Sequence, residues 1–129
     1  MTITIGLKGK REFIVEEKHT AYHLGSGGVL VFSTPSMVSL MEGASVNAID
    51  PLLPQGQMSV GIEISAKHLA ATPIGKRVWA EAEVIEIEKR RVMFIIKAWD
   101  EHELIGEATH TRFIIDLDRY TQRLKEKGG

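Results

Sequence analysis

The amino-acid sequence predicts an α+β fold in which an antiparallel β-sheet wraps around one central α-helix. A single segment, residues 34–50, has the small and apolar composition of a helix suited to burial. After Gly56 the apolar residues recur with a period of two, which is typical of strands. The strands that follow are joined mainly by short turns. One helix covered by such a sheet is an economical way to build a single core.

The first third of the chain leads into this helix. Residues 8–20 mix charged side chains with an apolar triplet and predict a strand with a charged end, whereas the glycines in residues 20–30 predict a loop. Thr34 is a good N-cap and Pro35 suits the first helical position. The stretch from Pro51 to Gly56 then ends the helix.

The remaining chain reads as strands. Met58, Val60, Ile62 and Ile64 alternate with Ser59, Gly61, Glu63 and Ser65, which predicts a strand reaching His68 with its apolar residues on one face. In the strand that starts at Val78 the apolar residues are even-numbered up to Val84 and odd-numbered from Ile85. This change would move them to the other face of the sheet, so we expect a β-bulge near Val84–Ile85. Further strands are expected over residues 92–99 and 104–116, and a short helix or frayed tail over residues 118–129.

Composition restricts the class of protein. The 129 residues fit one domain, 1–129, and the 43% hydrophobic and 26% charged residues are ordinary globular values. A net charge of -1 gives no general attraction to nucleic acid or anionic lipid, and no apolar run is long enough to cross a bilayer. There are no cysteines, which excludes thiolate catalysis and a cysteine zinc site. We therefore expect a cytoplasmic protein without nucleic-acid or membrane partners.

Glu42 is the most informative residue, because it is a lone carboxylate in the apolar helix. Burying a carboxylate is costly unless it is paired, hydrogen-bonded or protonated. A buried carboxylate also has a raised pKa and is a stronger base near neutral pH. We therefore expect Glu42 to be buried and to take part in chemistry.

Two segments, Ser33-Thr-Pro-Ser-Met-Val-Ser-Leu-Met-Glu42 and Val60-Gly-Ile-Glu-Ile-Ser-Ala-Lys-His68, carry a resemblance to a known family. The chain resembles hotdog-fold thioesterases of the fluoroacetyl-CoA thioesterase-like group from about residue 12 to residue 117. The resemblance implies a hotdog fold and hydrolysis of an acyl-CoA thioester with a small or medium acyl group. It also implies a homodimer with sites at the subunit interface, and the sequence leaves dimer and tetramer both open. The fluoroacetate-selective member has phenylalanines in a lid before the helix, and residues 24–28 contain none.

The family's functional residues fall on matching positions of this sequence. The resemblance implies catalytic roles for Thr34, Glu42 and His68, and substrate contacts for Gly61 and Arg112. Glu42 would activate water or attack the thioester directly, and His68 would move protons or orient the carboxylate. Because Thr34 and Glu42 are eight positions apart, about 12 Å along a helix, Thr34 is interpreted as positioning the reacting atoms.

Each residue also has a structural interpretation that the sequence leaves open. Thr34 can simply cap the helix, Glu42 can pair with a buried donor, and His68 can be a packing residue. The protein can accordingly be a non-catalytic acyl-CoA-binding hotdog protein, or an enoyl-CoA hydratase or dehydratase. No cofactor is expected. No metal site is predicted, because the other histidines lack the spacing of metal ligands; these are His19, His23, His102 and His110. His110, on a core strand, is the alternative proton carrier if His68 does not serve.

Overall fold

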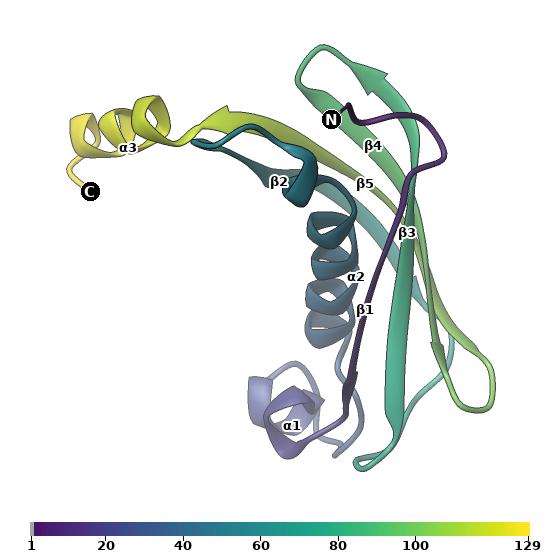
Figure 1. Cartoon of the computed structure of the whole chain (residues 1–129). Coiled ribbons are helices and arrows are strands. Elements are labelled where there is room, and N and C mark those ends of the chain that lie inside the picture. Colours follow the sequence, from purple (N-terminus) through teal and green to yellow (C-terminus); the bar gives the residue numbers. More distant parts are fainter. Residues whose placement is uncertain (1) are drawn as a thin grey trace.

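The computed structural model describes residues 2–129, which form a curved antiparallel sheet around a long helix (Figure 1). The elements in chain order are β1 (Lys8–Ile14), the 3-10 helix η1 (Glu17–His19), α1 (Ala21–Leu24), α2 (Thr34–Ile49), the 3-10 helix η2 (Asp50–Leu52), β2 (Gln57–His68), β3 (Arg77–Glu88), β4 (Arg91–Asp100), β5 (Leu104–Asp116) and α3 (Leu117–Glu126).

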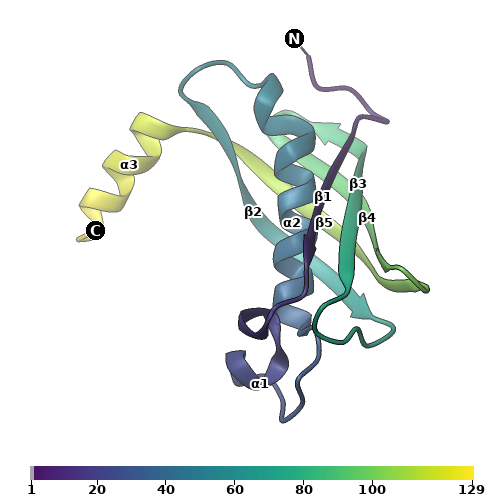
Figure 2. The same cartoon turned by 60° about the horizontal axis from the view of Figure 1, so that its bottom comes forward.

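The five strands are ordered β1-β3-β4-β5-β2, and every neighbouring pair is antiparallel. Helix α2 lies along the concave side of the sheet, with the edge strands β1 and β2 on either side of it (Figure 2). The expected α+β architecture, a sheet wrapped around one helix, is therefore confirmed.

The core lies between α2 and the inner face of the sheet. Met37, Leu40, Met41 and Ala44 on α2 are fully buried, as are the inward residues of β3 and β4, among them Val84, Phe94 and Ile96. On the side of β1, Gly9 lies so close to the α2 backbone at Ala44 and Ala48 that a side chain there would collide with it. This close approach fixes the helix against the edge strand.

Two expectations about the first third of the chain are wrong in detail. The strand expected over residues 8–20 ends at Ile14, because the chain then turns into η1. The loop expected over residues 20–30 contains the short helix α1, which Thr20 caps at one end and Gly25, at φ 71°, ends at the other.

The strands contain three irregularities, of which the sequence predicted one. Ile85 is the extra residue between paired Val84 and Glu86 on β3, so the expected bulge is confirmed. On β2 the pairing skips Ile62, between Gly61 and Glu63, and on β5 it skips Ile105. Within the described residues, no helix is long and apolar enough to cross a membrane.

Candidate functional site

The first turn of α2 presents Thr34 to the end of β2. Ser33 is the N-cap, because its side chain accepts the Ser36 N–H at 3.1 Å, and Thr34 is the first helical residue. The expectation that Thr34 caps the helix is therefore wrong. Since Ser33 provides the cap, the Thr34 hydroxyl is available to hydrogen-bond the Nδ1 of His68 at 2.8 Å.

His68 is held in a half-buried position at the end of β2. Its ring lies edge-on to Phe32, with 6.2 Å between ring centroids. Burial lowers the pKa of His68, and the nearby backbone of Ala70 raises it in part. The ring is therefore neutral at pH 7, and its Nε2 is buried without a hydrogen bond to any residue in 2–129. A pocket of about 360 Å³ lies beside it, lined in part by Phe32, Thr34 and His68.

Glu42 lies two turns further along α2. Its side chain is 40% exposed in the single chain, so the expectation that Glu42 is buried is wrong. Its Oε2 lies 3.7 Å from Nη1 of Arg112, whose side chain is only 7% exposed. The carboxylate is thus paired with a buried cation on one side and accessible on the other.

Arg112 is fixed by a polar network beneath Glu42. Its Nε donates to Ser59 Oγ at 2.7 Å and its Nη2 donates to the Ser59 carbonyl at 2.9 Å. The Ser59 hydroxyl in turn donates to Asp50 Oδ1 at 2.6 Å. A buried guanidinium with these partners can turn only its remaining Nη1 toward the site, which is the atom that faces Glu42.

His110 completes this network. Its Nε2 lies 3.1 Å from Arg112 Nη1, and its Nδ1 lies 2.7 Å from the Glu63 carbonyl. Because arginine only donates, Nε2 accepts and Nδ1 carries the proton. Burial, and secondarily the charge of Arg112, lower the pKa of His110, whereas the Glu63 carbonyl and Glu42 raise it. His110 is therefore neutral and holds Arg112 in place.

Gly61 forms the floor next to Glu42. A Cβ atom built on Gly61 would lie 2.8 Å from Glu42 Oε2, 3.1 Å from His110 Cε1 and 3.3 Å from Arg112 Nη1. Glycine is therefore required if the carboxylate is to keep this position. The bulge at Ile62 is what turns Gly61 inward, so the expected single apolar face of β2 is wrong: Ser59 and Gly61 face α2 together with Ile64 and Ala66.

Residues 15–118 match the sequence profile of the fluoroacetyl-CoA-specific thioesterase family. The chain belongs to this family. It is 35% identical to the fluoroacetyl-CoA thioesterase of Streptantibioticus cattleyicolor over 129 residues, which cover 95% of this chain and 93% of that protein.

Solved structures agree with this family assignment. A structure of the fluoroacetyl-CoA thioesterase FlK superposes with a TM-score of 0.91 at 34% identity and covers 98% of each chain. A thioesterase superfamily member from Thermus thermophilus superposes with a TM-score of 0.88 at 29% identity, covering 98% of this chain and 96% of the other. The fold is the hotdog fold that the sequence resemblance implied.

In this thioesterase-family chain the five predicted site residues form two clusters. Thr34 and His68 make one, and Glu42, Gly61 and Arg112 make the other. No hydrogen bond joins Glu42 to Thr34 or His68 within residues 2–129, in line with the separation of about 12 Å expected along the helix.

Sequence reasoning missed the support of the second cluster. Ser59 and Asp50 were not singled out, and His110 was identified only as a reserve proton carrier. The inward direction of Ser59 depends on the bulge at Ile62, which interrupts an alternation that looks regular in the sequence. Among residues 2–129, no group of three or more side chains is arranged to hold a metal ion.

Proposed function

We propose that this chain is an acyl-CoA thioesterase that hydrolyses a small or medium acyl-CoA thioester, with water as the second substrate and without a metal or cofactor. The observation that carries the proposal is the 2.8 Å hydrogen bond between Thr34 and the neutral His68 at the positive end of α2. A hydroxyl and an imidazole at a helix N-terminus suit a reaction in which a carbonyl oxygen becomes anionic. The family's activity toward a CoA thioester supports the same assignment.

The proposed reaction adds water across the thioester. Glu42 takes a proton from water, and the resulting hydroxide attacks the carbonyl carbon. The tetrahedral intermediate expels the thiolate when the carbon–sulfur bond breaks, and the proton held by Glu42 reaches the sulfur. Direct attack by Glu42, followed by hydrolysis of the anhydride, gives the same acid and thiol. Thr34 and His68 position the carbonyl and the proton being moved.

In this proposal the site is completed by a second copy of the chain, in a homodimer. The edge strand β2 exposes Met58 and Ile62, at 39% and 50% exposure, and its outer edge has no neighbouring strand within residues 2–129. Val38 lies midway between Thr34 and Glu42 on α2. If two α2 helices pack antiparallel about a twofold axis near Val38, Thr34 of one copy meets Glu42 of the other.

This arrangement also covers Glu42. A carboxylate that is 40% exposed in one chain would be screened from water by the partner helix, which strengthens its interaction with the reacting atoms. Within one chain, a substrate would instead have to bridge about 12 Å between the two clusters. For the cellular location, we propose the cytoplasm, where acyl-CoA esters are available.

The ion pair between Glu42 and Arg112 favours a second candidate function, a non-catalytic binder of acyl-CoA. Here the 3.7 Å contact would give Glu42 a structural role and leave no base for hydrolysis. The two candidates differ in Glu42→Gln: a catalyst loses turnover and keeps its ligand, whereas a binder has no turnover to lose.

A panel of acyl-CoA esters with a thiol-detecting reagent tests the proposal. We expect release of the thiol from short or medium esters, and a loss of roughly a hundredfold or more in kcat for Glu42→Gln. Glu63→Gln is the matched control, because Glu63 is an exposed carboxylate on β2 and only its backbone carbonyl serves the network. No release above background at enzyme concentrations near those of the substrate would defeat the enzyme assignment.

A further inference from the structure

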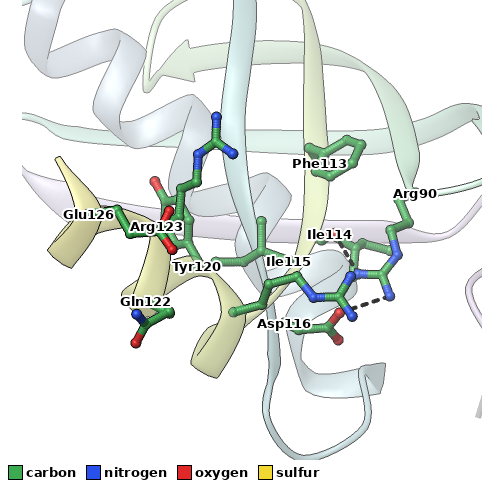
Figure 3. A pocket seen from close by; sticks show the side chains of 10 residues that line it. Arg90, Phe113, Ile114, Ile115, Asp116, Tyr120, Gln122, Arg123 and Glu126 are labelled. Carbon is green, nitrogen blue, oxygen red and sulfur yellow. Dashed lines mark hydrogen bonds and ion pairs between the residues drawn. The ribbon is translucent and has the colours of Figure 1, made fainter.

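A second pocket, separate from both clusters, lies where β5 meets α3. It has a volume of about 540 Å³ and lies between α3 and the turn that joins β3 to β4 (Figure 3). Its lining includes Arg90, Phe113, Arg119, Tyr120 and Arg123. The combination of guanidinium groups with aromatic rings is the chemistry that binds a phosphorylated, planar ligand.

The three arginines that line the pocket differ in how many contacts they make with other residues. The guanidinium of Arg90 already has partners in the protein: its Nη2 pairs with Asp116 at 3.1 Å, and its Nη1 donates to the Ile114 carbonyl at 3.1 Å. The Asp116 carboxylate is occupied by Gln57 as well as by Arg90, and these contacts lower the pKa of Asp116. The charge of Arg119 also lowers the pKa of Asp116, whereas Arg123 has no such effect on this carboxylate.

Arg119 and Arg123 provide the remaining positive charge. They are four residues apart on α3 and so lie on the same face of the helix. Both are exposed and line the pocket, with Glu126 as the second carboxylate in the lining. Three guanidinium groups against two carboxylates leave a net charge of +1, which favours an anion.

Tyr120 and Phe113 add the apolar component. Tyr120 directly follows Arg119 on α3, and its side chain is 38% exposed. Tyr120 on α3 and Phe113 on β5 both line the pocket (Figure 3). A flat heterocycle bound here would bury tyrosine surface that is otherwise in water.

The pocket is also within reach of the proposed reaction site. Arg112, beside Glu42, and Asp116, in the pocket, are four residues apart on β5, which corresponds to about 13 Å along a strand. Phe113 directly follows Arg112 and so points to the opposite face of the sheet, which means that a ligand joining Glu42 to this pocket passes around the end of β5 at Asp116.

We propose that the pocket formed by Arg90, Arg119, Tyr120 and Arg123 binds the adenosine 3′,5′-bisphosphate end of the coenzyme A substrate. This proposal rests on the proposed thioesterase function for its biological meaning. Arg119 and Arg123 hold the phosphates, Tyr120 stacks on the adenine, and Arg90 with Asp116 forms the fixed wall. The acyl end then lies toward Gly61 and Glu42.

Binding of free adenosine 3′,5′-bisphosphate, measured by calorimetry on the full chain, tests the pocket without reference to catalysis. The variant Arg119→Gln/Arg123→Gln is expected to bind roughly five- to thirtyfold more weakly. Lys125→Gln is the matched control, because Lys125 is an exposed cation on α3 that does not line the pocket, and its affinity should be unchanged. Tyr120→Leu should weaken binding of the nucleotide but not of inorganic pyrophosphate. Absence of nucleotide binding to the unmodified protein, or equal affinity for all these proteins, overturns the proposal.

Kinetics with two substrates link the pocket to turnover. For an acyl-CoA the double arginine variant should show a KM raised roughly five- to thirtyfold at unchanged kcat. For the corresponding acyl-pantetheine, which lacks the nucleotide, both constants should equal those of the unmodified protein. An equal rise in KM for both substrates, or none for either, contradicts the assignment. If the protein hydrolyses no thioester, the proposed function fails, while the calorimetric result still decides whether the pocket binds the nucleotide.

Discussion

Mixing two inactive variants tests where the reactive groups of one site come from. Glu42→Gln removes the proposed base, and His68→Asn removes the imidazole that hydrogen-bonds Thr34. Each variant alone should lose roughly a hundredfold or more in kcat. In a twofold-symmetric dimer with shared sites, Glu42 of one subunit works with Thr34 and His68 of the other.

The expected recovery follows from this arrangement. A mixed dimer has one site in which both residues are substituted and one site in which both are intact. Equal amounts of the two variants, exchanged at random, give about half mixed dimers. Since each mixed dimer has one working site of two, the mixture should regain about a quarter of the unmodified activity.

The assay is thiol release after the two variants are denatured and refolded together, with mixed dimers quantified by two different affinity tags. A control mixture pairs Glu42→Gln with the double variant Glu42→Gln/His68→Asn, in which every site lacks Glu42 and no activity should return. If mixed dimers form and activity stays at the level of the single variants, all three groups act within one chain. The antiparallel arrangement about Val38 would then be wrong.

Three further outcomes follow from the cluster around Glu42. Gly61→Ala places a methyl group 2.8 Å from Glu42 Oε2, so kcat should fall roughly ten- to a hundredfold at nearly unchanged melting temperature; unchanged kcat would contradict the close packing. Ser59→Ala breaks the buried polar network and should lower the free energy of unfolding by about 1–3 kcal/mol in chemical denaturation; a change near zero would show that the network contributes nothing. Burial lowers the pKa of His110 below its ordinary 6.5, so the unfolded chain takes up the proton first, and stability present above pH 6.5 is lost as the pH falls. Burial also lowers the pKa values of His68 and His19, so His110→Asn should reduce this loss, without removing it, in unfolding measurements between pH 7 and 5. The exposed His102→Asn should leave the loss unchanged.

The sequence was sufficient for the fold because its strongest signals were local. Pro35 in the first turn and Pro51 after the last turn mark the ends of the helix at residues 34–49, although Ser33 and not the expected Thr34 is its N-cap. The change near Ile85 in which residues of β3 are apolar predicted a bulge that the structure contains. The ends of the early elements were less predictable. The turn of the chain into η1 and α1 depends on Thr20, which accepts the N–H of His23, and such side-chain contacts leave no periodic pattern.

The sequence did not predict how the candidate site residues are arranged. The motif segments identified Thr34 and His68, and the structure places them in contact. Glu42 was expected to be buried because its helix neighbours are apolar, yet the face of α2 that carries it is not covered within one chain. Burial of a helical side chain depends on which elements reach that face, and composition does not contain this information.

The bulge residue Ile62 divides β2 into two stretches that face different parts of the molecule. The stretch before it carries Ser59 and Gly61 beneath the proposed reaction centre, and the stretch after it presents Ile64 and Ala66 to the core. Substitutions in the first stretch therefore act on the polar network beneath Glu42, and substitutions in the second act on the apolar core. Deleting Ile62 would remove the bulge and turn the side chains of one of the two stretches to the opposite face of the sheet.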